Sequence, residues 1–131
     1  PQVVQRFIKG EEPFKIFGYN QTRSFNFIDD AVSGTILAME SKNTNGEIFH
    51  IGDMNSEITI EELIKFIGDL MSYNGNYIKQ GAHSGSVSRR CPNTQKAKKV
   101  LGYNPIIKWK EGVKKTVNWY KDYIKSNKDI F

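Results

Sequence analysis

Apolar side chains recur with helical spacing most clearly between Thr59 and Met71. The residues that fall on one helix face are Ile60, Leu63, Ile64, Ile67, Leu70 and Met71. Thr59 and Glu62 stand at the spacing of a capping box, in which each side chain satisfies an orphan amide of the first turn. The pattern therefore predicts a helix that begins after Thr59 and turns one face to a core.

Four other segments have weaker helical patterns. Pro1 suits a first helical turn, and Gly10 predicts the end of the helix that follows it. We expect a second helix to run to about Glu40 after a cap at Asp29 or Asp30. The remaining two are a short helix that is capped by Asn93 or Thr94 and ended by Gly102, and a last helix from about Trp109 to Ile124.

Short apolar runs predict strands between these helices. Residues 14–17 alternate, residues 24–28 place two phenylalanines on one side, and residues 47–51 are expected to form the most buried strand. A further short strand is expected at Tyr77 and Ile78, followed by a polar loop over residues 81–88. The pattern indicates an α/β fold (mixed α+β) and one domain over residues 1–131.

The composition is that of an ordinary globular domain. The chain has 131 residues, 38% of them hydrophobic and 25% charged, which excludes a disordered chain. No apolar run approaches the roughly 20 residues that span a bilayer, and no signal peptide is visible. Cys91 is the only cysteine, so we expect a reducing, cytoplasmic location and no membrane partner. The abrupt start suggests a piece of a longer protein, and residues 125–131 are expected to fray.

Positive charge is concentrated in one region. The net charge is +5, and residues 79–110 contain eight Lys or Arg and no Asp or Glu. This balance favours phosphates, nucleotides, nucleic acid or an acidic membrane surface, and charge alone does not choose among them. Arg23, just before a predicted strand, and Arg90, close to the rigid Pro92, are candidate anion ligands because a guanidinium fork matches two phosphate oxygens. We expect Arg90 to face inward and Arg89 to face solvent.

Catalytic and metal-binding patterns are scarce. His50, His83 and Cys91 lack the close spacing of zinc ligands, so no metal site is predicted. His50 is expected to pack within its strand and His83 to be solvated. No nucleophile turn and no Gly-rich phosphate loop is present, so no catalytic residue is predicted. Asn55, in the loop after residues 47–51, could bind a nucleobase edge through its amide or simply form a turn.

Several motifs occur in an order that resembles a known family. They are Phe7 to Gly18, Thr22-Arg23-Ser24-Phe25 with Asp29-Asp30, Phe49-His50-Ile51-Gly52, Ile58 to Leu63, Arg89 to Thr94 with Lys96-Ala97, Leu101 to Pro105, and Glu111-Gly112-Val113 with Trp119-Tyr120. Together they resemble the C-terminal, substrate-binding half of the NAD-dependent sugar-nucleotide epimerases and dehydratases, which are extended short-chain dehydrogenases. The resemblance covers nearly the whole chain.

The resemblance implies a nucleobase that lies along one strand. At the matching motif these positions are Phe14, Ile16 and Phe17, and Asn55 corresponds to a base or ribose contact. The family's Asn-Ile-Gly motif before that contact reads His50-Ile51-Gly52 here, which is a departure.

The resemblance also implies two ligands for the diphosphate. Arg23 and Arg90 occupy the matching positions and would approach the diphosphate from opposite sides. Asn93 stands where the family frequently has Asp, so the residue keeps a capping role and loses a charge.

The family's redox chemistry belongs to a part that is absent from this sequence. Its N-terminal half is a Rossmann domain with a Gly-rich loop and a Tyr-x-x-x-Lys pair, and this sequence has neither. The resemblance therefore implies that NAD binds the missing half, that none binds this chain, and that the chain is inactive alone. The implied partners are a nucleoside-diphosphate sugar, the missing Rossmann half and a second copy in a homo-oligomer.

Two other functions remain open from the sequence. The basic stretch and its aromatic residues would suit a nucleic-acid-binding module, which we consider the less favoured alternative. The basic residues could also form a solvated face on a structural or interaction module without a small ligand. A steep salt dependence of binding would indicate the nucleic-acid-binding module. No stabilisation by any nucleoside diphosphate would favour the structural or interaction module.

Overall fold

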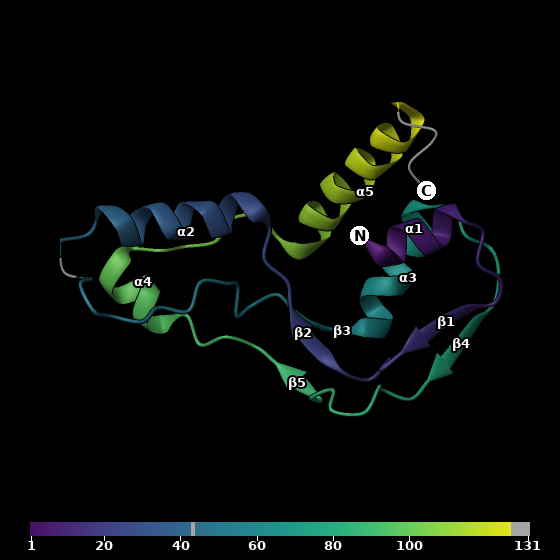
Figure 1. The fold of residues 1–131 in the computed structure, drawn as a ribbon, viewed down its shortest axis with the longest axis horizontal. Coiled ribbons are helices and arrows are strands. Elements are labelled where there is room, and N and C mark those ends of the chain that lie inside the picture. The colour runs from purple at the N-terminus through teal and green to yellow at the C-terminus, as the bar shows by residue number, and fades with distance from the viewer. Residues whose placement is uncertain (43, 127–131) are drawn as a thin grey trace.

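The computed structural model describes residues 1–42 and 44–126. The helices are α1 (Gln2–Ile8), α2 (Ile28–Glu40), α3 (Ile60–Leu70), α4 (Gln95–Leu101) and α5 (Trp109–Ser126). The strands are β1 (Phe14–Phe17), β2 (Thr22–Ser24), β3 (Glu57–Thr59), β4 (Tyr77–Gln80) and β5 (Arg89–Arg90). This is the mixed α/β fold that the sequence predicts, with short strands among the helices (Figure 1).

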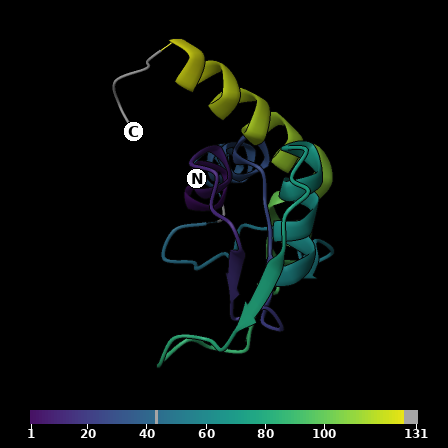
Figure 2. The same cartoon turned by 90° about the vertical axis from the view of Figure 1, so that its right-hand side faces the viewer.

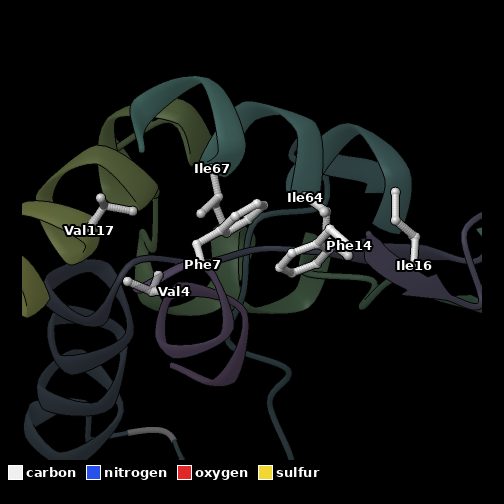
Figure 3. Packing of buried hydrophobic residues seen from close by; sticks show 7 residues of the cluster. All are labelled: Val4, Phe7, Phe14, Ile16, Ile64, Ile67 and Val117. Atoms are coloured by element: carbon white, nitrogen blue, oxygen red, sulfur yellow. The ribbon is translucent and has the colours of Figure 1, made fainter. Parts of the chain in front are cut away.

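One part of the molecule, which we call the body, consists of α1, α3, α5, β1 and β4. The predicted capping box begins α3, because the Thr59 hydroxyl accepts from the Glu62 amide and the Glu62 carboxylate accepts from the Thr59 amide. Every second residue of β1 points under α3, so Phe14 and Ile16 are fully buried. The body core, shown in Figure 3, consists of Val4, Phe7, Phe14, Ile16, Ile64, Ile67 and Val117.

The strands form two small sheets. In the body, β1 pairs in parallel with β4. The second sheet has the order β3-β2-β5, with β2 antiparallel to β3 and parallel to β5. Its two outer strands come from far along the chain, so this sheet is assembled by long-range pairing.

The other part, which we call the arm, consists of α2, α4 and residues 47–51. It extends to one side of the body in Figure 1. Its core is small, with Ala97, Leu101 and Tyr103 buried. α2 comes close to this core at Gly34, where a β-carbon would lie 2.7 Å from the Ile51 side chain.

Aliphatic side chains on the arm are exposed. Ile28, Val32, Ile36 and Met39 follow one another along one side of α2, and each is at least 45% exposed. Ile48, in the neighbouring segment, is 79% exposed. No described residue covers this face.

The predicted buried strand at residues 47–51 is wrong for this chain. The segment has no strand partner among the described residues, and its apolar side chains are at most partly buried. His50 is exposed, which corrects the expectation that it packs inside a strand. Residues 47–51 do have an apolar pattern that suits a buried strand, but no strand among the described residues pairs with them.

The predicted strand at residues 24–28 is shifted. Regular pairing covers Thr22–Ser24, and Ile28 already begins α2. Phe27 is the N-cap residue of α2, so neither predicted aspartate is its cap. Asp30 is instead buried, and its carboxylate accepts the backbone N–H groups of Ile106 and Ile107 at 3.1 and 2.9 Å. This aspartate anchors the segment that leads into α5.

The C-terminal prediction is partly confirmed. α5 begins at Trp109, as expected, and continues to Ser126. Of the expected frayed tail, residues 127–131 lie outside the described residues. Within the described residues, no helix combines the length and the apolar character needed to cross a membrane.

Candidate functional site

The two predicted anion ligands lie side by side on neighbouring strands. Arg23 of β2 and Arg90 of β5 are register partners in the parallel pair. Neighbouring strands are about 4.8 Å apart, and paired residues project from the same face of a sheet. The fold therefore brings these two guanidinium groups to one face, although they are far apart in the sequence.

The opposite face of this sheet is held by Glu57. Its carboxylate accepts two hydrogen bonds from Arg89, at 2.8 and 2.7 Å, and one from the Thr22 hydroxyl at 2.6 Å. The Arg89 guanidinium and then the Thr22 hydroxyl lower the pKa of Glu57 to about 2. Glu57 thus fixes Arg89 on one face of β5, which leaves Arg90 for the other.

Arg90 is exposed, so the expectation that it faces inward is wrong. The two neighbouring arginines nevertheless differ, because Arg89 is the one that forms an ion pair, with Glu57. Among residues 1–42 and 44–126, no carboxylate pairs with Arg23 or Arg90. Two adjacent cations without an acidic partner create a positive potential that favours an anion.

The Arg23 guanidinium is half-buried and donates only to neutral oxygens. Its acceptors are the carbonyl of Thr22 at 2.7 Å, the Gln21 side-chain oxygen at 3.1 Å, the Val87 carbonyl at 2.9 Å and the Ser86 hydroxyl at 3.5 Å. Two of these four acceptors come from the loop over residues 81–88. The group is therefore oriented by the fold while its charge stays uncompensated.

The predicted nucleobase strand presents its three residues differently. The side chains of Phe14 and Ile16 are 0% exposed, so they lie in the core and are not available to a ligand. Phe17 is 40% exposed, and its ring stacks on His83 with centroids 5.1 Å apart. The Phe14 N–H donates to the carbonyl of Asn76, just before β4, and the Gly18 N–H donates to Gln80 of β4, so alternation points the Phe17 backbone groups away from that strand.

Asn55 lies in a different place from the two arginines. It lines a pocket of about 270 Å³ with residues of α4 and the segment 103–108, and neither Arg23 nor Arg90 contributes to that pocket. The Asn55 backbone N–H donates to the buried Asp53 carboxylate at 3.0 Å, which is a turn-forming contact. The structure brings Arg23 and Arg90 together but does not bring Asn55 to them.

A second, larger cavity lies away from the anion site. It measures about 740 Å³ and is bordered by α1, α3, α5 and residues 25–27, with no charged side chain in its lining. The described residues also contain no group of three His, Cys, Asp or Glu side chains that could hold a metal ion.

The chain does not fit a dinucleotide cofactor. Such a site needs a glycine-rich turn between a strand and the N-terminus of a helix. Residues 25–27 join β2 to α2, residues 91–94 join β5 to α4, and β3 continues directly into α3. None of these connections contains a glycine, so none of them can form such a turn.

The sequence interpretation missed two parts of this site. One is Glu57, which the alternation of Glu57-Ile58-Thr59 could have placed on the face of a short strand. The other is the contact of residues 83–87 with Phe17 and Arg23, for which the sequence carries no local signal.

Comparison with known proteins identifies relatives of the whole chain. No family model matches it. UDP-glucuronate 4-epimerase of Thermodesulfobacterium geofontis is 36% identical over 131 residues, an alignment that covers 97% of this chain and 40% of that protein. The chain thus spans about 40% of the length of this curated relative.

Solved structures agree with this relationship. The crystal structure of UDP-glucose 4-epimerase from Thermotoga maritima with UDP-glucose has a TM-score of 0.83 at 30% identity and covers 94% of this chain and 39% of that one. The dTDP-glucose 4,6-dehydratase from Streptomyces venezuelae with NAD bound has a TM-score of 0.83 at 25% identity, over 96% of this chain and 39% of that one. The chain therefore matches the C-terminal half of the NAD-dependent sugar-nucleotide epimerases and dehydratases, the extended short-chain dehydrogenases.

Proposed function

We propose that this chain binds the nucleoside-diphosphate part of a sugar nucleotide and positions the sugar for chemistry carried out by an NAD-binding half. The observation that carries the proposal is the register pairing of Arg23 with Arg90 on one sheet face, without an acidic partner among the described residues. The relatives' names, which specify UDP- and dTDP-linked sugars, support this ligand class. The reaction type, isomerase or lyase, would be set by the other half.

The energetics suit a diphosphate. A hydrogen bond to a charged group contributes roughly 1.5–3 kcal/mol, and micromolar affinity corresponds to about 8 kcal/mol. Two arginines that each hold a phosphate oxygen would therefore supply a large share of the binding free energy. Their adjacency also suits a short anion, since both can reach one pyrophosphate.

The nucleobase is assigned to the free edge of β1 at Phe17. This residue combines an exposed ring with backbone groups that point away from β4, so it offers stacking and hydrogen bonding together. Phe14 and Ile16 contribute by fixing the strand on the core, not through their side chains. Asn55 would contact the base or ribose of a ligand that also reaches the pocket beside α4.

The basic region suits a single diphosphate better than a nucleic-acid groove. Several cations of residues 79–110 are already neutralised by acids from elsewhere in the fold. These pairs are Lys79 with Glu61, Arg89 with Glu57, and Lys96 with Glu47. The free positive charge is therefore more local than the sequence suggests.

The exposed face of α2 is assigned to the NAD-binding half. Its aliphatic residues and Ile48 form an apolar surface that this chain leaves open. The relatives are more than twice as long as this chain, so a further domain of the same enzyme is the occupant that we propose.

Titration calorimetry with UDP tests the ligand class. We expect Arg23→Ala and Arg90→Ala each to weaken UDP binding about 10- to 100-fold, because each removes a charge-assisted contact. Lys99→Ala, which removes an exposed charge on α4, is the matched control and should leave the affinity unchanged. Unchanged UDP affinity in both arginine variants would refute the proposal, and a steep salt dependence would favour nucleic acid.

A further inference from the structure

Residues 81–88 connect β4 to β5 and thus run from the body to the sheet that carries the two arginines. Every residue of this loop is exposed. Gly85 has a φ of +79°, and the Ser86 N–H donates to the His83 carbonyl at 3.1 Å, so a tight turn sits at the centre of the loop. In Figure 2 the loop extends away from the helices.

The same loop contacts two of the residues assigned to the nucleotide. The His83 ring lies on the Phe17 ring at 5.1 Å with an interplanar angle of 20°. The Val87 carbonyl accepts from the Arg23 guanidinium at 2.9 Å, and the Ser86 hydroxyl lies 3.5 Å from the same nitrogen. Gln21 ties Ser86 in place, since its side-chain oxygen accepts from the Ser86 hydroxyl at 3.0 Å.

These contacts reproduce the chemistry that a nucleotide would offer. A flat, nitrogen-containing ring stacks on the aromatic residue, and oxygen atoms accept from the arginine. The order along the loop is also that of the ligand, with a ring at one end and oxygens at the other.

We propose that residues 81–88 are a displaceable cover of the nucleotide site, in which His83 occupies the place of the nucleobase on Phe17 and the oxygens of Ser86 and Val87 occupy the place of phosphate oxygens on Arg23. This inference rests on the proposed function. Binding exchanges the cover for the ligand, and no covalent step is involved.

The direction of the exchange follows from the charges. Ser86 and Val87 offer neutral oxygens, whereas a diphosphate offers charged ones, and charge-assisted hydrogen bonds are roughly twice as strong as neutral ones. The cover therefore yields to a nucleoside diphosphate and not to water. It also keeps the unpaired Arg23 oriented in the absence of ligand.

Hydrogen–deuterium exchange of the 131-residue chain with and without UDP tests the displacement. We expect amides of residues 81–88 to exchange faster when UDP is bound, because the ligand releases the loop, while amides of α3 do not change. Slower exchange of the loop with UDP would show that it closes over the ligand, and would overturn the inference while leaving the proposed function intact.

Variants of the cover give an independent test. The double variant His83→Ala with Ser86→Ala should bind UDP about 3- to 10-fold more tightly, since the competent open state becomes more populated. Ser84→Ala, a change in the same loop at a residue outside these contacts, is the control and should bind like the parent. Equal or weaker binding by the double variant overturns the cover.

Two partial ligands separate the two ends of the loop. Uridine should gain affinity from His83→Ala and not from Ser86→Ala, and inorganic pyrophosphate should show the reverse. Failure of the parent chain to bind UDP, uridine or pyrophosphate would overturn the proposed function, and the cover with it.

Discussion

The body and the arm of this chain bury their apolar residues to very different extents. The body encloses a cluster that extends from Val4 to Val117 and includes two fully buried residues of β1. The arm buries only Ala97, Leu101 and Tyr103, and it leaves the aliphatic side of its longest helix exposed. The body therefore covers its own apolar residues, whereas the arm leaves an apolar face open, for which we proposed the NAD-binding half as the occupant.

A complete capping box distinguishes α3 from α1 of the body, which lacks a side-chain hydrogen bond at its N-cap residue, as the arm helices do. In the body, α3 begins with a complete capping box at Thr59. In the arm, neither α2 nor α4 has a side-chain hydrogen bond at its N-cap residue. The sheet β3-β2-β5 joins the two parts. The proposed phosphate ligands Arg23 and Arg90 therefore lie between the body, which has the larger core, and the arm, which leaves apolar residues exposed.

The largest expected effect on the free energy of unfolding comes from truncating one buried side chain in each of the two cores. Phe14→Ala should destabilise the chain by about 3–5 kcal/mol, because it leaves a cavity among rigid neighbours. Leu101→Ala should cost about 2 kcal/mol, because the sparse arm can collapse around the gap. Urea denaturation followed by circular dichroism measures both.

An exposed position in the body provides the control for this pair. Ile8→Ala, at a residue 37% exposed on α1, should change the free energy of unfolding by less than about 0.5 kcal/mol. Equal losses from Phe14→Ala and Leu101→Ala would mean that the two cores are equally packed, and the contrast would be lost.

The next effect concerns the open face of the arm. We expect the isolated chain to self-associate through α2, and the double variant Val32→Lys with Ile36→Lys to weaken that association at least about tenfold, because it would bury unpaired charges. Analytical ultracentrifugation measures the association, and the exposed Lys99→Ala serves as a charge-changing control. A parent chain that stays monomeric would show that the face needs no partner.

The smallest effect lies at the junction. The pKa of Glu57 is lowered to about 2, so its contribution to stability is complete above a pH of about 4.5 and is lost as the pH falls towards 2. Glu57→Gln should therefore flatten the decline in unfolding midpoint between those two pH values, and only modestly, because its partner Arg89 is exposed to solvent.

Glu47→Gln provides the matched comparison in the arm. The pKa of Glu47 is also lowered, by Lys96 alone. Glu47→Gln should therefore flatten the acid limb, that is, the decline of the unfolding midpoint at low pH, less than Glu57→Gln does. An acid limb that is the same in the parent and both variants would show that neither pair contributes.

The sequence predicted the parts of the fold that depend on local patterns. The helix after Thr59 was predicted with its cap, because periodicity and capping act within a few residues. Residues 47–51 were predicted wrongly, because their apolar pattern reports a neighbour that the described residues do not include.

The candidate site was predictable only in its components. Arg23 and Arg90 were identified from their residue type and motif, but their adjacency depends on the parallel pairing of β2 with β5. No local signal specifies that register. The stacking of His83 on Phe17 was missed for the same reason, since it depends on where a loop returns.

The doubling of arginine in β5 has a consequence for tolerance to insertions and deletions. A one-residue slip of a strand moves every side chain to the other face. If β5 slipped by one residue, Arg89 would lie opposite Arg23, and Arg90 would lie opposite Ser24, whose partner on the far side is Glu57. The preceding loop can therefore gain one residue while a cation still stands beside Arg23 and another still meets the carboxylate, whereas the loss of one residue would place Cys91 beside Arg23.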